Sequence, residues 1–153
     1  MAMSNEPIIY VAKIAYSTSV DGVGLRNALY VSGCPIHCKG CHNLKLWDIN
    51  AGNPQTVSQV FASLNEDDFN ISILGGEPLF QYKAILSLCR LIKRETNKTI
   101  WLWSGYTYEQ IQKDYGDILE YIDVLIDGPF IEEKKDLTLD WRGSSNQRII
   151  KLK

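Results

Sequence analysis

The sequence predicts an α/β fold with a mainly parallel sheet. Short apolar runs of strand length alternate with stretches in which apolar residues recur at helical spacing. Such alternation is typical of βαβ units, because neighbouring parallel strands need a helical crossover between them. Each of four predicted strands also stops at a glycine-containing turn. With 153 residues, the chain has the size of one domain, so we expect residues 1–153 to form a single unit.

The first half of the predicted sheet contains two strands and two helices. Residues 29–31 (Leu-Tyr-Val) form the first predicted strand, and residues 71–74 (Ile-Ser-Ile-Leu) form the second. Thr56 followed by Gln59 is a capping-box pattern that predicts a helix start. The apolar positions of this helix and of the next one follow helical spacing. They are Val57, Val60, Phe61 and Leu64 in the first helix, and Ile85, Leu88, Cys89 and Ile92 in the second.

The second half continues the alternation. Residues 100–103 (Ile-Trp-Leu-Trp) and 124–126 (Val-Leu-Ile) predict two further strands, and 148–152 predicts a fifth. Thr107 with Gln110 predicts the cap of the intervening helix.

Composition excludes several classes of protein. Sixteen basic and 18 acidic residues give a net charge of −2 and a pI near 5.7, which argues against nucleic-acid binding. No run approaches the ~18 apolar residues of a membrane span. Residues 1–10 lack the basic and apolar regions of a signal peptide. We therefore expect a cytoplasmic protein, in which clustered cysteines are metal-binding or catalytic more often than disulfide-bonded.

The chemically unusual residues follow the predicted strands. In parallel α/β sheets, functional groups collect on the loops at the carboxyl ends of the strands. The loops concerned carry the cysteines after the first strand, Gly-Gly-Glu-Pro after the second, Ser-Gly-Tyr after the third and Asp-Gly-Pro-Phe after the fourth. We expect these four loops to meet in one site.

Three of the four cysteines lie within eight positions. Cys34, Cys38 and Cys41 have the spacing C-x3-C-x2-C, which places three thiolates on one short segment. One interpretation is a [4Fe–4S] cluster, which normally takes four cysteine ligands and here would keep one iron open to a substrate. A second is structural zinc, completed by His37 or His42. A third is a Cys38/Cys41 redox dithiol.

The motifs together resemble a known family. The cysteine spacing after the first strand and Gly-Gly-Glu-Pro after the second are similar to the pattern of radical S-adenosylmethionine enzymes. The resemblance is closer to one branch, the activating proteins of anaerobic ribonucleoside-triphosphate reductases, and covers about 130 residues. It is carried by DGVGLR (21–26), VSGCPIHCKGCHN (31–43), GGEP (75–78), WLWSGY (101–106), LIDGPF (125–130) and WRGSSNQR (141–148).

This resemblance implies a fold, cofactors and partners. The fold is an incomplete, open βα barrel of the radical S-adenosylmethionine type, consistent with the ~250 residues that a complete barrel takes. The cofactors are a [4Fe–4S] cluster with three cysteine ligands and S-adenosylmethionine. Reductive cleavage of the latter gives a 5′-deoxyadenosyl radical, which takes hydrogen from a glycine of the large reductase subunit. The implied partners are that subunit and a low-potential electron donor such as a flavodoxin-type protein.

The resemblance also assigns site residues. The metal ligands are Cys34, Cys38 and Cys41, and no catalytic side chain is implied beyond the cluster and the cofactor. Glu77 would accept a hydrogen bond from the ammonium of the methionine moiety. The family often has an aromatic residue before the last cysteine, where this chain has Gly40, so that an adenine contact there would use the backbone. The implied cofactor-binding residues are Gly40, Cys41, His42, Gly75, Gly76, Glu77, Ser104 and Asp127.

Two other functions stay open from the sequence. One is activation of another glycyl-radical enzyme of the pyruvate formate-lyase type, against which WRGSSNQR and the short chain argue. The other is a zinc-stabilised binding module without catalysis.

A first prediction separates the ligands from the remaining cysteine. Replacing Cys34, Cys38 or Cys41 singly by Ala is expected to abolish cleavage of S-adenosylmethionine, because each removes a cluster ligand. Cys89 fits the apolar stripe of a helix, so Cys89→Ala should keep cleavage and lower only stability. Anaerobic turnover assays with iron analysis measure both effects. Loss of the cluster in Cys89→Ala would contradict the three-cysteine interpretation.

Overall fold

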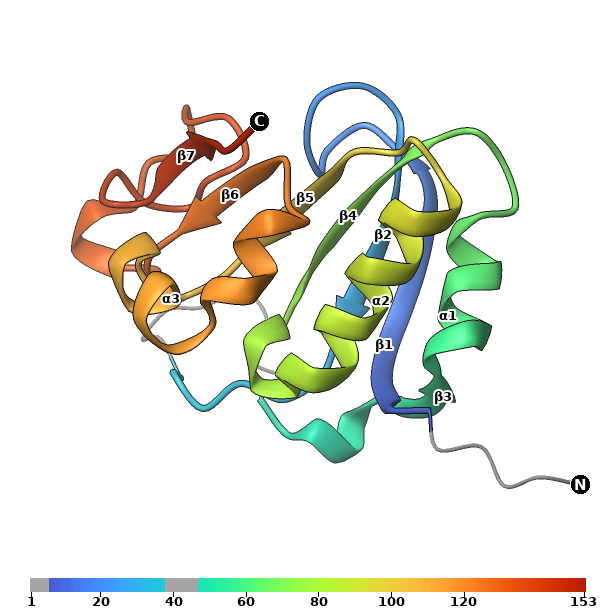
Figure 1. The fold of residues 1–153 in the computed structure, drawn as a ribbon. Helices are drawn as coiled ribbons and strands as arrows, with labels where there is room; N and C mark the ends of the chain where they lie inside the picture. The colour runs from blue at the N-terminus through green and yellow to red at the C-terminus, as the bar shows by residue number, and fades with distance from the viewer. Residues whose placement is uncertain (1–5, 38–46) are drawn as a thin grey trace, which may run out of the picture.

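The computed structural model describes residues 6–37 and 47–153. Within these residues the chain forms one seven-stranded sheet with the order β3-β1-β2-β4-β5-β6-β7. The strands are β1 (Ile8–Thr18), β2 (Arg26–Val31), β3 (Asn53–Thr56), β4 (Asn70–Gly75), β5 (Ile100–Trp103), β6 (Val124–Asp127) and β7 (Arg148–Lys151). The two edge strands β3 and β7 do not pair with each other, so the sheet is open (Figure 1).

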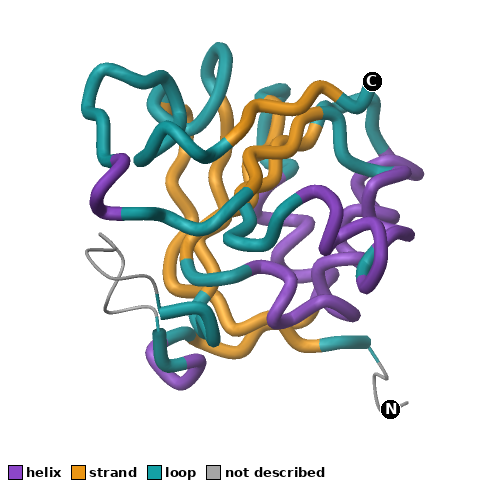
Figure 2. The backbone as a smooth tube through the Cα atoms, turned by 90° about the vertical axis from the view of Figure 1, so that its left-hand side faces the viewer, coloured by secondary structure: helices purple, strands orange, loops and turns teal. Residues whose placement is uncertain are grey.

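Three α-helices connect the strands: α1 (Val57–Leu64), α2 (Tyr82–Glu95) and α3 (Tyr108–Asp114). They lie on one side of the sheet, and long loops lie on the other (Figure 2). Four short 3₁₀ helices complete the described structure: η2 (Ile49–Ala51), η3 (Pro78–Gln81), η4 (Gly116–Glu120) and η5 (Glu132–Lys134). The helices on one face follow from right-handed crossovers, which all place their helices on the same side when the strands advance in one direction.

The strand directions in the sheet differ in part from the predicted, mainly parallel arrangement. Only the central strands β2, β4, β5 and β6 pair in parallel. The pairs β1–β2, β1–β3 and β6–β7 are antiparallel. The expectation of a mainly parallel sheet is therefore wrong at both sides of the sheet, because the chain reaches β2 and β7 without a helical crossover. The α/β class and the openness are confirmed, whereas the arrangement is an open sheet rather than a barrel.

Two strands were not predicted at all. β1 is eleven residues long, and its buried Ile9 and Val11 alternate with more exposed neighbours. The stretch is rich in β-branched and aromatic residues, so a strand signal was present in the sequence. β3 reads Asn-Pro-Gln-Thr, which has no such signal; it pairs at the sheet edge, where a proline is tolerated.

The predicted helix starts are confirmed. The hydroxyls of Thr56 and Thr107 each accept a hydrogen bond from the backbone N–H three residues on. In return, the side-chain oxygens of Gln59 and Gln110 accept from the backbone N–H groups of these threonines. α2 buries its apolar stripe against the sheet, including a fully buried Cys89. Burial raises the pKa of the Cys89 thiol to about 12, so this cysteine stays an unreactive part of the core.

The second prediction tests the junction between β4 and the loop that follows it. Gly75 has φ +116°, and a Cβ there would lie 2.5 Å from the backbone N and O of Val31. Gly75→Ala is therefore expected to lower the free energy of unfolding by more than about 2 kcal/mol, through strain and a backbone clash. Denaturant titration of the metal-free protein measures this. Gly116→Ala is the control, because nothing lies within 4 Å of its Cβ position; equal losses in both variants would refute the explanation.

Candidate functional site

The loops after β2 and β4 are joined by main-chain hydrogen bonds. The N–H of Gly76 donates to the carbonyl of Val31 at 2.8 Å, and the N–H of Glu77 donates to the carbonyl of Gly33 at 2.8 Å. Gly33 itself has φ +90°, a conformation that favours glycine. The start of the cysteine segment and the Gly-Gly-Glu-Pro motif therefore lie side by side, as the strand-end argument predicted.

Cys34 follows directly, and its N–H donates to the carbonyl of Trp47 at 3.0 Å. Cys34 is one of the residues that line the cavity described below. The other two predicted ligands, Cys38 and Cys41, lie outside the described residues, as do Gly40 and His42. Cluster ligation by three cysteines stays a prediction for this reason.

Glu77 is a buried carboxylate, 1% exposed, at the centre of these loops. Its Oε1 accepts from the N–H of Gly105 at 2.6 Å. Its Oε2 accepts from the hydroxyl of Ser104 and from the N–H of Leu79, both at 3.0 Å. Burial raises the pKa of Glu77 to about 7, and the three hydrogen bonds oppose this rise. None of the three donors carries a positive charge.

Ser104 and Gly105 bring the end of β5 into the same site. The hydroxyl of Ser104 donates to Glu77 and accepts from the N–H of Tyr106 at 3.1 Å. A Cβ on Gly105 would lie 2.4 Å from Cδ1 of Ile36, so the glycine permits close contact with the cysteine segment. The prediction that Ser104 belongs to the site loops agrees with this placement; whether it contacts a cofactor stays a prediction.

These loops surround a cavity of about 180 Å³. Its lining includes glycines and aromatic residues, and Glu77 is the one acidic residue among the described residues that line it. The lining residues are Cys34, Ile36, Trp47, Leu74, Gly75, Gly76, Glu77, Trp103, Ser104, Gly105, Gly128, Phe130, Trp141, Gly143 and Gln147. They come from the last residues of β4 and β5, from the loops after all four parallel strands and from the C-terminal segment.

The C-terminal segment is fixed against the loop after β6. The side chain of Gln147 accepts from the N–H groups of Gly143 and Ser144 and donates to the carbonyl of Gly128 at 2.9 Å. The indole N–H of Trp103 donates to the carbonyl of Trp141 at 2.7 Å. Sequence reasoning did not assign the aromatic lining residues, because a tryptophan on a strand predicts burial and not the side of the sheet on which it lies.

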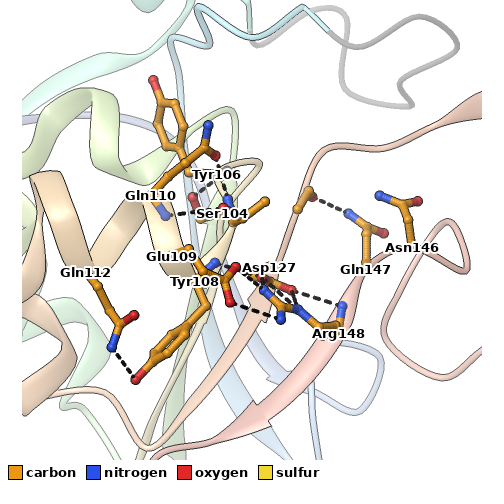
Figure 3. Close-up of polar contacts among 12 residues, drawn as sticks. Ser104, Tyr106, Tyr108, Glu109, Gln110, Gln112, Asp127, Asn146, Gln147 and Arg148 are labelled. Atoms are coloured by element: carbon orange, nitrogen blue, oxygen red, sulfur yellow. Dashed lines mark hydrogen bonds and ion pairs between the residues drawn. The ribbon is translucent and has the colours of Figure 1, made fainter.

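Asp127 occupies a different place from its neighbours in this site. It is 1% exposed and absent from the cavity wall. Its carboxylate accepts from the N–H of Tyr108 at 2.7 Å and from the guanidinium of Arg148, which also contacts Glu109 at 2.7 Å (Figure 3). The side chain thus joins β6, β7 and α3. Its proposed contact with the cofactor stays a prediction. The carboxylate accepts from four donors, which are the N–H of Tyr108 and the backbone N–H, Nε and one terminal nitrogen of Arg148.

The described part of the site is compatible with an iron–sulfur cofactor beside a second ligand. Cys34, whose thiol would prefer soft metals, lines the cavity together with glycines that admit close backbone approach. Glu77, a buried carboxylate with no cationic partner among residues 6–37 and 47–153, lines the same cavity and would favour a cationic group. In the described residues no helix has the length and apolarity of a membrane span.

Comparison with known proteins agrees with this chemistry. The model of the 4Fe-4S single cluster domain family matches residues 20–150, so the chain is an iron–sulfur protein of that class. Anaerobic ribonucleoside-triphosphate reductase-activating proteins are similar over most of their length. The one from Vibrio cholerae is 40% identical over 85% of this chain and 90% of its own. The one from Haemophilus influenzae is 40% identical over 90% of this chain and 96% of its own. The chain belongs to this family of activating proteins.

The third prediction concerns the pH dependence of stability. The folded-state pKa of Glu77, about 7, lies above the ordinary 4.5. Its contribution to stability is therefore complete below about pH 4.5 and is lost as the pH rises through 7. Between pH 5 and pH 8 the metal-free protein should lose about 2 to 3 kcal/mol of unfolding free energy from this group. In Glu77→Gln that loss should be absent.

Denaturant titrations at several pH values measure the difference between the two proteins. Glu109→Gln is the matched control. The hydrogen bond from Arg148 lowers the pKa of this exposed carboxyl, so its titration should change stability only below the range from pH 5 to pH 8. Identical pH profiles for the wild type and Glu77→Gln would show that the Glu77 carboxyl titrates normally.

Proposed function

We propose that this chain generates the glycyl radical of an anaerobic ribonucleoside-triphosphate reductase. The observation that carries the proposal is the convergence of Cys34, the Gly-Gly-Glu-Pro loop and the Ser104–Gly105 turn on one cavity, in a chain that belongs to the activating-protein family. Bound together, a reduced [4Fe–4S] cluster and S-adenosylmethionine supply the reductive cleavage that yields a hydrogen-abstracting radical.

The chain's own residues would hold and orient these groups. Cys34, with Cys38 and Cys41, would provide three thiolates and leave one iron for the amino and carboxylate groups of S-adenosylmethionine. The glycines after β4 would let the backbone approach the methionine moiety. Glu77 accepts three hydrogen bonds, so one of about four lone-pair positions is left for the cofactor's ammonium group.

The aromatic residues that line the cavity would exclude water during the radical step rather than bind the cofactor through polar groups. Trp103, Phe130 and Trp141 surround the space without presenting an ionisable group. Such a wall excludes water from the reacting centre. Because the sheet is open and its edge strands are not joined, a macromolecular substrate has a side from which to approach. We propose the large reductase subunit as that substrate and a low-potential protein as the electron donor.

The fourth prediction tests the activity directly. After anaerobic reconstitution with iron and sulfide, the protein should be brown and, on reduction, cleave S-adenosylmethionine to methionine and 5′-deoxyadenosine. Added large reductase subunit should then show a glycyl radical by electron paramagnetic resonance. Cys34→Ala should abolish both signals, and Cys89→Ala is the control that keeps them.

Two outcomes would overturn this proposal. A colourless protein with one tightly held zinc would indicate a binding module. A radical that forms on a pyruvate formate-lyase-type enzyme and not on the reductase would indicate the other class of partner.

A further inference from the structure

The chain enters and leaves the cysteine segment at one place. Where it enters, the N–H of Cys34 donates to the carbonyl of Trp47 at 3.0 Å. Nearby, the hydroxyl of Ser32 donates to the carbonyl of Ile49 at 2.6 Å. The two flanks of the segment, residues 32–34 and 47–49, are therefore joined by two hydrogen bonds.

A third contact lies beyond these two. The imidazole of His37 stacks on the indole of Trp47, with ring centroids 4.2 Å apart and planes 8° from parallel. His37 directly precedes Cys38 and adopts φ +51°. A residue other than glycine rarely holds this left-handed conformation unless its surroundings fix it. The stack is a contact that fixes it here.

We propose that His37 and Trp47 are positioning residues for the iron–sulfur cluster, whose stacked rings hold the two flanks of the cysteine segment together. The inference rests on the proposed function, because it assumes that the cluster is bound by this segment. Three thiolates on one short stretch must reach a single cluster. Fixing the flanks beforehand reduces the conformational entropy lost when the cluster binds.

The ring face, and not a nitrogen atom, carries the observed contact. The indole Nε1 of Trp47 is buried and has no hydrogen-bond partner among residues 6–37 and 47–153. The nearly parallel planes are those of an aromatic stack. Phenylalanine at position 37 should therefore preserve the effect. That expectation distinguishes positioning from metal ligation by the imidazole, which phenylalanine cannot provide.

The fifth prediction uses iron release as its measurement. His37→Gly and Trp47→Ala, reconstituted anaerobically, should lose iron to a chelator about fivefold faster than the wild type, a ratio expected for one aromatic stack. His37→Phe should release iron at the wild-type rate. His37 is exposed, so its replacement removes no core packing, and glycine suits the left-handed backbone. The variant with both changes should be no faster than Trp47→Ala alone.

Tyr115→Ala is the matched control. It removes a ring that pairs with Tyr82 at 4.9 Å and with Tyr106 at 5.8 Å, and none of these three tyrosines lines the cavity. The variant should therefore lower the melting temperature but not change iron release. Wild-type release rates in His37→Gly and Trp47→Ala would overturn the inference while the proposed function stands. Fast release from His37→Phe would overturn it in favour of an imidazole ligand. Failure of the wild type to assemble a cluster would overturn the proposed function and this inference together.

Discussion

The site depends on one buried carboxylate. Glu77 lies between the ends of β2, β4 and β5 and is bonded to two of the neighbouring loops through its backbone and its side chain. Its main-chain N–H reaches Gly33, beside the first cysteine, while its oxygens reach Ser104 and Gly105. A charge buried among uncharged donors is costly, and a cationic group in the cavity would offset that cost. The same feature thus fixes the loops and favours a positively charged ligand.

The rest of the cavity follows from how the sheet ends on each side. The antiparallel pair of β6 and β7 returns the C-terminal segment to the carboxyl end of β6. Asp127 and Arg148 hold this pair to α3 (Figure 3), and Gln147 then closes the adjoining loop onto Gly128. The antiparallel strand β7 therefore helps to position the C-terminal part of the cavity wall. After the loop that follows β2, the carbonyl of Trp47 accepts a hydrogen bond from the N–H of Cys34.

Much of this arrangement could be predicted from sequence because its signals are local. The capping boxes at Thr56 and Thr107 and the stripe of α2 depend on residues three or four positions apart. The loops with unusual residues were assigned to one end of the sheet by topology alone, and the cavity contains residues from each. β3 had no local signal, since an edge strand is defined by its partner. The structural role of Asp127 could not be predicted either. It is bonded to Arg148, 21 positions away, and Arg148 in turn contacts Glu109, which lies 18 positions before Asp127.

The sequence by itself determined the three α-helices, the strands β2, β4, β5, β6 and β7, the order of the motifs and the family, since each is encoded by residue types at short, fixed spacing. The tertiary structure decided the direction of the outer strands, the burial of Glu77, the stacking of His37 on Trp47 and the aromatic wall. These properties depend on contacts between residues distant in the chain, and the free energy of such contacts is set by burial and geometry that exist only once the sheet has formed.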